Sequence, residues 1–313
     1  MSDFAILLSS AGRRVALLEL LRADAIALGL KPRLIATDLA PAFSAACAAA
    51  DVALRMPPAR HAEFAPALLA LCRDHGVRLL VPTIDPELAP IAAIATSLRG
   101  AGTHANISSP EAIAIARDKF LTAKALGADA PVSVLPPETL PLPAIAKPRD
   151  GSASAGVRVI TTPTELPDHY VVQQKLDGPE YTVNLFVADG RTLAAVPHLR
   201  REVRAGEVAK GITVRHPALA AIAKNLPRAV PGLSGALCFQ AIDTPQGPKV
   251  IEINARFGGG FPLAHAAGAP FTSWLIRQAA GLPPDASDDW QDGTTMLRYD
   301  AAIFGRGDSD SWR

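Results

Sequence analysis

The sequence is poor in cysteine, has no excess of either charge and has no long apolar run, and these features argue against several classes of protein. Its three cysteines, in 313 residues, have no close pair and no second ligand at metal spacing, which argues against a disulfide scaffold or a zinc site. Lys and Arg (31) balance Asp and Glu (30), so charge does not favour nucleic acid or an anionic bilayer. No apolar run reaches the ~20 residues that cross a bilayer. We therefore expect cytoplasmic localisation, no nucleic-acid partner and no membrane partner.

The sequence does contain ample material for a folded core, because 49% of its residues are apolar and only 19% are charged. Its length suggests two domains. Over the first ~105 residues strand-like runs alternate with helical stretches, which is the rhythm of a parallel sheet with crossover helices. The near-continuous apolar run from Phe4 to Leu8 is typical of a strand covered on both faces. We predict a doubly wound parallel α/β domain over residues 1–108.

The rest of the chain predicts an α+β arrangement, in which strands and helices cluster without strict alternation. Helices are expected over 109–126, where Ser108 or Ser109 can cap and Pro110 suits the first turn, and over 217–229. After Gly127, Pro-rich connectors separate short strand candidates. Residues 305–313 are polar and are expected to be frayed.

The most informative segment is the strand candidate Val-Ile-Glu-Ile-Asn-Ala-Arg at 250–256. Side chains alternate faces along a strand, so Glu252, Asn254 and Arg256 share one face. A hairpin turn at 244–248 lets Gln240, on the preceding strand, face the same side. Carboxylate and amide oxygens suit Mg²⁺, which takes its remaining ligands from phosphates and water. The alternative interpretation is an exposed polar face of an edge strand.

Two further segments suit a nucleotide. In Ala-Lys-Pro-Arg-Asp-Gly-Ser-Ala-Ser-Ala-Gly-Val at 146–157, small residues let backbone N–H groups approach an anion, and Lys147 supplies positive charge. An ordinary hairpin would use the same small residues. In the extended connector at 171–183, backbone groups can read an adenine edge, and Glu180 can accept hydrogen bonds from ribose hydroxyls. A solvated hinge is the alternative there.

These three segments, in this order and spacing, resemble the ATP-grasp superfamily. Within it the chain is similar to short proteins related to one half of the carbamoyl-phosphate synthase large subunit, near the branch of the pyrrolysine-biosynthesis ligase. Four further blocks support the resemblance: SSAGRR near the start, PTIDPEL at 82–88, RDK at 117–119 and RREVRAGEVAKG at 200–211. The resemblance implies a preATP-grasp domain over 1–108 and an ATP-grasp domain over 109–304, with a mobile lid at about 122–176 and a body at about 177–304.

The resemblance also implies roles for individual residues, with ATP and Mg²⁺ (or Mn²⁺ in its place) as cofactors. Residues implied at the phosphates are Lys119, Lys147, Ser152, Ala153, Ser154 and Gly156. Residues implied at the adenosine are Gln174, Lys175, Leu176 and Glu180. The implied metal ligands are Gln240, Glu252 and Asn254, and Arg256 would stabilise the transferred phosphoryl group. Because several branches have Asp where this chain has Gln240, the resemblance leaves open whether one metal ion or two are held.

The acceptor side is less clear from the sequence. The basic stretch containing Arg204 and Lys210 suits a carboxylate substrate or the γ-phosphate, with Lys210 as the first choice, although a charge run is commonly a solvated face. At the end of a predicted parallel strand, Thr83, Asp85 and Glu87 either bind an amino group or begin a helix. Gly258 and Gly259 either cradle an acyl group through backbone N–H groups or form a turn into the next helix.

The predicted activity is ATP-dependent ligation of a small carboxylate, amino-acid-like in character, to an amine, through an acylphosphate. Two alternatives remain within the superfamily: a kinase or carboxylase acting on carbamate or bicarbonate, and an inactive nucleotide-binding protein. An NAD-dependent oxidoreductase is disfavoured, because SSAGRR lacks the G-x-G-x-x-G pattern. The sequence does not specify the oligomeric state, and a homodimer is left open because dimers are common among closed symmetric assemblies.

Overall fold

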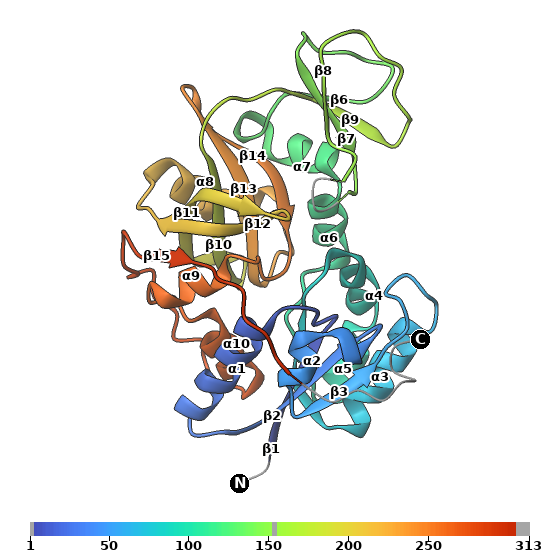
Figure 1. Cartoon of the computed structure of the whole chain (residues 1–313), viewed down its shortest axis with the longest axis vertical. Coiled ribbons are helices and arrows are strands. Elements are labelled where there is room, and N and C mark those ends of the chain that lie inside the picture. The colour runs from blue at the N-terminus through green and yellow to red at the C-terminus, as the bar shows by residue number, and fades with distance from the viewer. Residues whose placement is uncertain (1–2, 152–154, 305–313) are drawn as a thin grey trace. The chain divides into compact units, whose positions relative to one another are not determined.

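The computed structural model describes residues 3–151 and 155–304, which form two compact units (Figure 1). The first contains the described residues up to Ile107, together with Pro270–Ala286 and those that follow Arg298. The second contains the described residues of Ser108–Ala269 and Ser287–Arg298. The first unit therefore includes two later returns of the chain as well as its N-terminal part.

The first unit is a five-stranded parallel sheet in the order β3-β2-β1-β4-β5. The alternating sequence pattern correctly predicted a parallel sheet with helices between its strands. The strands are β1 (Asp3–Ser9), β2 (Lys31–Asp38), β3 (Val52–Arg55), β4 (Val77–Pro82) and β5 (His104–Ala105). The helices of the first 107 residues are α1 (Val15–Ala27), α2 (Ala45–Ala49), α3 (Phe64–Asp74), α4 (Leu88–Ala93) and α5 (Ala95–Gly100). Helices on both faces explain why β1 is buried along six consecutive positions.

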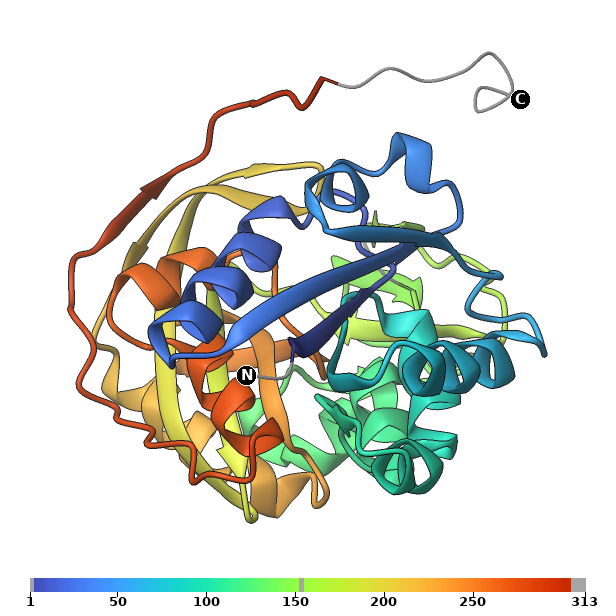
Figure 2. The ribbon, with the colours of Figure 1, turned by 90° about the horizontal axis from the view of Figure 1, so that it is seen from below.

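A late helix, α10 (Phe271–Ala279), completes the first unit. It contacts α1, and the two lie side by side in both ribbon views (Figure 1 and Figure 2), although they are far apart in the sequence. Thr272 Oγ1 donates a 2.5 Å hydrogen bond to Asp24 of α1. The helix buries one apolar face, which explains why the chain returns to this unit.

The second unit begins with α6 (Pro110–Arg117) and α7 (Lys119–Leu126), which lead into a small antiparallel sheet. The predicted cap is confirmed, because the Ser109 side chain accepts from Ala112 N–H at the start of α6. The small sheet has the order β6-β9-β7-β8, with strands β6 (Ser133–Val134), β7 (Ala144–Pro148), β8 (Arg158–Ile160) and β9 (Tyr170–Gln174). The candidate lid therefore consists of short strands linked by long connectors.

A larger antiparallel sheet forms the rest of this unit, in the order β14-β13-β10-β11-β12-β15. Its strands are β10 (Glu180–Ala188), β11 (Arg191–Arg204), β12 (Glu207–Thr213), β13 (Gly235–Thr244), β14 (Gly247–Asn254) and β15 (Thr295–Leu297). The helices of this part are α8 (Pro217–Ala229), which packs on β10 and β11, and α9 (Phe261–Ala266). Alternate side chains of β10, such as Val183 and Leu185, are fully buried. The polar residues between them face the other side of the sheet.

None of the helices in the described residues is long and apolar enough to span a membrane. The three cysteines are buried free thiols, as a core role predicts. Residues 152–154 and 305–313, which include part of the predicted flap and the predicted frayed tail, lie outside the described residues.

Candidate functional site

The large sheet gathers the predicted metal ligands on one face. Gln240 of β13 pairs directly with Glu252 of β14, and Cys238 pairs with Asn254. Directly paired residues in an antiparallel sheet point to the same side, as do residues two apart along a strand. Gln240, Glu252 and Asn254 therefore lie next to one another, in the arrangement that the sequence pattern predicted.

Neighbouring strands extend this face with further polar residues. Thr182 of β10 pairs with both Gln240 and His198, and Asn184 of β10 pairs with Cys238. The row from β14 to β11 thus reads Glu252, Gln240, Thr182, His198. The resulting surface is polar across four strands, whereas the opposite surface packs on α8.

A chain of hydrogen bonds connects the three polar residues of the 252–256 segment. Arg256 Nη2 donates to Asn254 Oδ1 (2.9 Å), and Asn254 Nδ2 donates to Glu252 Oε1 (3.0 Å). Arg256 Nη1 also donates to the Phe257 carbonyl (3.0 Å). These bonds hold a carboxylate, an amide oxygen and a guanidinium in a fixed order along the strand.

Two buried lysines lie beside this strand. Lys147 of β7 reaches the carbonyl of Ile251 (Nζ to O, 3.3 Å), and Lys119, the first residue of α7, reaches the carbonyl of Gly151 (2.5 Å). Pairing of Gln240 with Glu252 and of Ala241 with Val250 leaves Ile251 as the extra residue of a β-bulge. The bulge lies where the Lys147 ammonium meets the strand.

The electrostatics of Lys147 show which charged groups share the site. Burial, reinforced by the positive charge of Lys119, lowers the pKa of Lys147 to about 8, and Glu252 and Glu180 act in the opposite direction. Two lysines and two carboxylates therefore interact within this unit. Burial and the neighbouring ammonium group outweigh the two carboxylates, so an anion bound at Lys147 would stabilise its charged form. The arrangement suits a polyanion.

The predicted ribose residue, Glu180, starts β10 and forms an ion pair with Arg200 of β11. The Arg200 side chain is only 5% exposed and also donates to the Gly206 carbonyl (2.9 Å). A ribose at this carboxylate would share it with Arg200. Sequence reasoning missed this partner, because Arg200 looked like part of a solvated charge run.

The predicted adenine residues follow β9. Gln174 is exposed and is held by a backbone hydrogen bond from its N–H to the Val132 carbonyl, whereas Lys175 and Leu176 are partly buried. Lys175 forms an ion pair with Asp177. In the predicted flap, Gly156 is exposed and has a φ of +74°. Ser152, Ala153 and Ser154 lie outside the described residues, so the flap's predicted phosphate contacts stay predictions.

The glycine run after Arg256 is a tightly packed turn into α9. An added Cβ would lie 2.8 Å from Cys238 Sγ at Gly258, 2.6 Å from the Glu207 carboxyl at Gly259 and 2.6 Å from His198 Nε2 at Gly260. Side chains of this unit thus fill the space beside all three glycines. Of the two alternatives that the sequence left open, the packing supports the turn.

Arg298, which follows β15 at the edge of the sheet, forms hydrogen bonds that stabilise this turn. Its guanidinium donates to Glu207 Oε2 (2.7 Å) and to the carbonyl of Gly259. Glu207 in turn lies against the Gly259 backbone. Sequence reasoning missed this pair. The one available signal was the run of three glycines, which indicates that other groups pack closely against the backbone there.

His198 contributes packing and hydrogen bonding in its neutral form. It is fully buried, and its Nδ1 lies 3.3 Å from Nδ2 of Asn184. Burial, reinforced by the charges of Arg200 and Arg298, lowers the pKa of His198 to about 3. The imidazole therefore stays in its neutral form, with one N–H, near neutral pH.

The pairing of β11 with β12 does not bring Lys210 or Arg204 to the polar face. Gly211 pairs with Arg200, so Lys210 beside it points to the opposite side of the sheet. Lys210 and Arg204 both pair with Glu202 (2.6 and 2.9 Å), and their side chains are about half exposed. The structure thus places both predicted acceptor residues in a solvated ion-pair cluster.

The other predicted acceptor residues belong to the first unit, where Glu87 is fully buried. Its carboxylate accepts from Ser9 Oγ (2.6 Å), Ser10 Oγ (2.8 Å), Thr83 N–H (2.6 Å) and Ile84 N–H (3.0 Å). Asp85 begins a short 3₁₀ helix, Asp85–Glu87. Glu87 thus joins the loops after β1 and β4, and of the two interpretations the structure supports the helix start.

The donor set on the large sheet fits Mg²⁺. It offers one carboxylate and two amide oxygens from Glu252, Gln240 and Asn254, and Mg²⁺ accepts oxygen ligands of this kind while sharing phosphates and water. Within 3–151 and 155–304 there is no group of three or more His, Cys, Asp or Glu side chains that could hold a metal ion.

Comparison with protein-family models gives two matches that together span most of the chain. Residues 6–105 match the model of the PylC-like N-terminal domain. Residues 167–301 match a model described as ATP-grasp in the biosynthetic pathway with Ter operon. The second match contains every predicted metal ligand.

Among curated proteins, the chain is similar to the ATP-grasp enzyme fsqD of Aspergillus fumigatus. The two are 34% identical over an alignment that covers 28% of this chain and 18% of that protein. The similarity thus spans less than a fifth of the curated relative.

Solved structures resemble the chain in fold at low identity. One is the biotin carboxylase domain dimer of Hydrogenobacter thermophilus 2-oxoglutarate carboxylase, in complex with MgADP, ADP and bicarbonate (TM-score 0.73, 16% identity, 94% of this chain and 74% of that chain). Another is the L-amino acid ligase from Bacillus licheniformis (TM-score 0.67, 17% identity, 94% of this chain and 79% of that chain). Phosphoribosylglycinamide synthetase from Anaerococcus prevotii has the same TM-score of 0.67. At these identities the likeness shows the fold alone.

Proposed function

Because the chain belongs to the ATP-grasp superfamily and has a PylC-like N-terminal domain, we propose that it is an ATP- and Mg²⁺-dependent ligase joining a small carboxylate to an amine. The observation that carries the proposal is the polar face of the large sheet. There Glu252, Asn254 and Arg256 form one hydrogen-bonded line, and Lys147 contacts the same strand. Phosphoryl transfer requires mainly positioning and charge neutralisation, which these groups can supply.

In this proposal the phosphates of ATP lie between the two lysines and the 252–256 segment. Lys119 and Lys147 neutralise phosphate oxygens. The connector at 174–176 contacts the adenine, and Glu180 contacts the ribose. Glu252, Asn254 and Gln240 hold Mg²⁺, which neutralises negative charge on the transferring phosphoryl group.

The proposed reaction proceeds in two steps. A carboxylate oxygen of the substrate attacks the γ-phosphorus of ATP, the bond to the β,γ-bridging oxygen breaks, and ADP leaves. Arg256 stabilises the equatorial oxygens during this transfer. The amine then attacks the acylphosphate carbon, loses a proton, and releases phosphate as the amide forms. Lys210 has no role in this scheme, because it lies on the opposite face of the sheet.

The experiment is a panel of carboxylates and amines scored for ADP release with Mg²⁺. A ligase releases ADP only when both substrates are present. ADP release with bicarbonate alone would instead support the carboxylase or kinase alternative. An activity that depends on NAD(H) would contradict the proposed ligase activity. Nucleotide binding without turnover by any pair would support an inactive nucleotide-binding protein.

Glu252→Gln tests the metal site within the same panel. The change keeps the size of the side chain and removes its charge, so we expect turnover to fall on the order of 10²–10³-fold. Glu165→Gln, at an exposed loop position of the same unit, is the matched control and should keep full activity. Equal activity in the two variants would remove Glu252 from the mechanism.

A further inference from the structure

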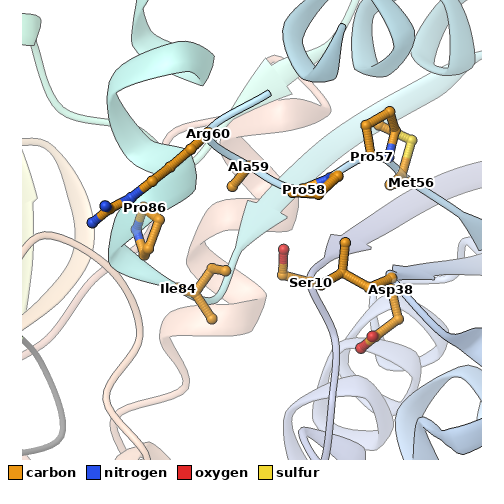
Figure 3. A pocket seen from close by; sticks show the side chains of 10 residues that line it. Ser10, Asp38, Met56, Pro57, Pro58, Ala59, Arg60, Ile84 and Pro86 are labelled. Carbon is orange, nitrogen blue, oxygen red and sulfur yellow. The ribbon is translucent and has the colours of Figure 1, made fainter. Parts of the chain in front are cut away.

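A cavity of about 410 Å³ opens at the carboxyl ends of the parallel strands of the first unit (Figure 3). Segments that follow β1, β2, β3 and β4 all contribute to it. In doubly wound sheets this edge, where strand order reverses between β1 and β4, is where ligands bind. The volume lies in the range of small-molecule pockets. None of the residues proposed for nucleotide or metal binding lines this cavity.

The walls of the cavity are mostly apolar. They comprise Leu39, Met56, Ile84 and the three prolines Pro57, Pro58 and Pro86. Leu39 and Ile84 leave 54% and 37% of their surface exposed to solvent. A ligand with an apolar body would remove this surface from water, and the flexible Met56 side chain can adapt to its shape.

The floor of the cavity is held rigidly. Ser10 adopts a φ of +51°, which is uncommon for a residue with a side chain, and its Oγ donates to the buried Glu87 carboxylate. Asp38, at the end of β2, accepts from the N–H groups of Gly12 (2.9 Å) and Ala40 (3.3 Å). The two carboxylates next to the cavity are therefore already engaged by groups of the unit's own loops.

Arg60 is the remaining charged group of the lining. Within the described part of the chain, its guanidinium has no carboxylate partner and no hydrogen bond. Figure 3 shows its side chain extending past Pro86 at the edge of the cavity. A guanidinium beside an apolar pocket recognises a carboxylate in a planar, bidentate geometry.

We propose that this cavity binds a small organic carboxylate with an apolar body, its carboxylate paired with Arg60 and its body against Leu39, Met56 and Ile84. The combination of one unpaired cation with an apolar wall selects against two other classes of ligand. A cation would meet only carboxylates that are already engaged, and a small polar anion would leave the apolar wall in water. This proposal does not depend on the proposed ligase activity.

The test uses methionine as a local probe, because the chain has only three methionines and Met56 lines the cavity. The full-length protein is labelled with ¹³C-methyl methionine and titrated with 3-phenylpropanoate, without ATP. We expect a saturable shift of the Met56 resonance, assigned with Met56→Leu, and no shift of Met296, which lies in the second unit. The amide 3-phenylpropanamide and the small anion acetate should each bind at least about tenfold more weakly.

Arg60→Gln should weaken 3-phenylpropanoate to the level of the amide, whereas Arg73→Gln, at an exposed position of α3, should leave its affinity unchanged. The unliganded Met56 resonance verifies that each variant keeps the pocket. The proposal is overturned if Met56 does not respond saturably, or if Arg60→Gln binds the probe as tightly as the parent protein. Because no ATP is present, a failed ligase assay and a failed pocket test are separate results.

Discussion

Lys147 is 7% exposed, and its burial beside Lys119 lowers the pKa of its ammonium group to about 8. Phosphate oxygens at this lysine would favour the charged form and raise its pKa. We therefore predict that ATP binding takes up a proton above pH 8, and that affinity falls as pH rises through that value. Calorimetry at pH 8.5 in two buffers of different ionisation enthalpy measures the uptake. Lys147→Met should abolish it, and the exposed Lys224→Met should retain it.

The same lysine makes a prediction about stability. Its pKa is about 8 in the folded protein against an ordinary 10.5, so between these values the unfolded chain binds more protons and stability rises with pH. At pH 7 both states are protonated and the full penalty of burying the charge applies. Lys147→Met should therefore raise the free energy of unfolding at pH 7 by up to about 3 kcal/mol. In urea titrations the gain should shrink between pH 8 and pH 10.5, and a gain independent of pH would contradict this account.

Sequence alone predicted which residues share a face within one strand and across the hairpin of β13 and β14, but not which residues meet across the other strands. Glu252 and Asn254 followed from alternation along β14, and Gln240 from the short hairpin. Lys210 could not be placed, because the face that it occupies on β12 follows from the pairing of Gly211 with Arg200 across strands. Sequence reasoning did not pair Glu180 with Arg200, although the Asp189-Gly190 turn between β10 and β11 is typical of a hairpin.

At the scale of elements, the turn between β14 and α9 positions Arg256. A Cβ at Gly259 would lie 2.6 Å from the Glu207 carboxyl, which Arg298 holds, so either this ion pair or the turn must shift. Displacements of about 1 Å near a reacting centre can cost on the order of 10²-fold in rate. We predict that Gly259→Ala lowers kcat by about that factor with little change in KM for ATP. Gly100→Ala, with open space at its Cβ, is the control, and comparable kinetics in both would argue against a positioning role.

Elements with local signals were predicted well, and elements defined by distant partners were not. The predicted helix at 217–229 matches α8, because Pro217 and an amphipathic pattern mark it locally. β12 was missed because Glu207 and Lys210 made it look like a charge run. β15 is three residues long and becomes a strand by pairing with β12, so its own sequence carries too little information.

At the scale of the whole molecule, the first unit is not a continuous stretch of sequence. The predicted N-terminal domain ended at residue 108, yet α10 belongs to this unit and buries Phe271, Trp274, Leu275 and Ile276. The chain therefore passes into the second unit and returns before the first unit is complete. Hydrophobic periodicity can indicate that a segment is helical, but it gives no information about the partner of that helix.

This discontinuity predicts how fragments should behave. A fragment of residues 3–107 lacks α10 and exposes the surface of α1 that α10 covers, so we expect no cooperative urea transition from it. A permuted fragment in which residues 270–286 precede residues 3–107 through a flexible Gly/Ser linker should regain that transition. Replacing Trp274 by Ala within the permuted fragment removes a large buried side chain and should cost about 3–5 kcal/mol. If residues 3–107 alone unfold as cooperatively as the permuted fragment, α10 is an accessory to this unit rather than part of its core.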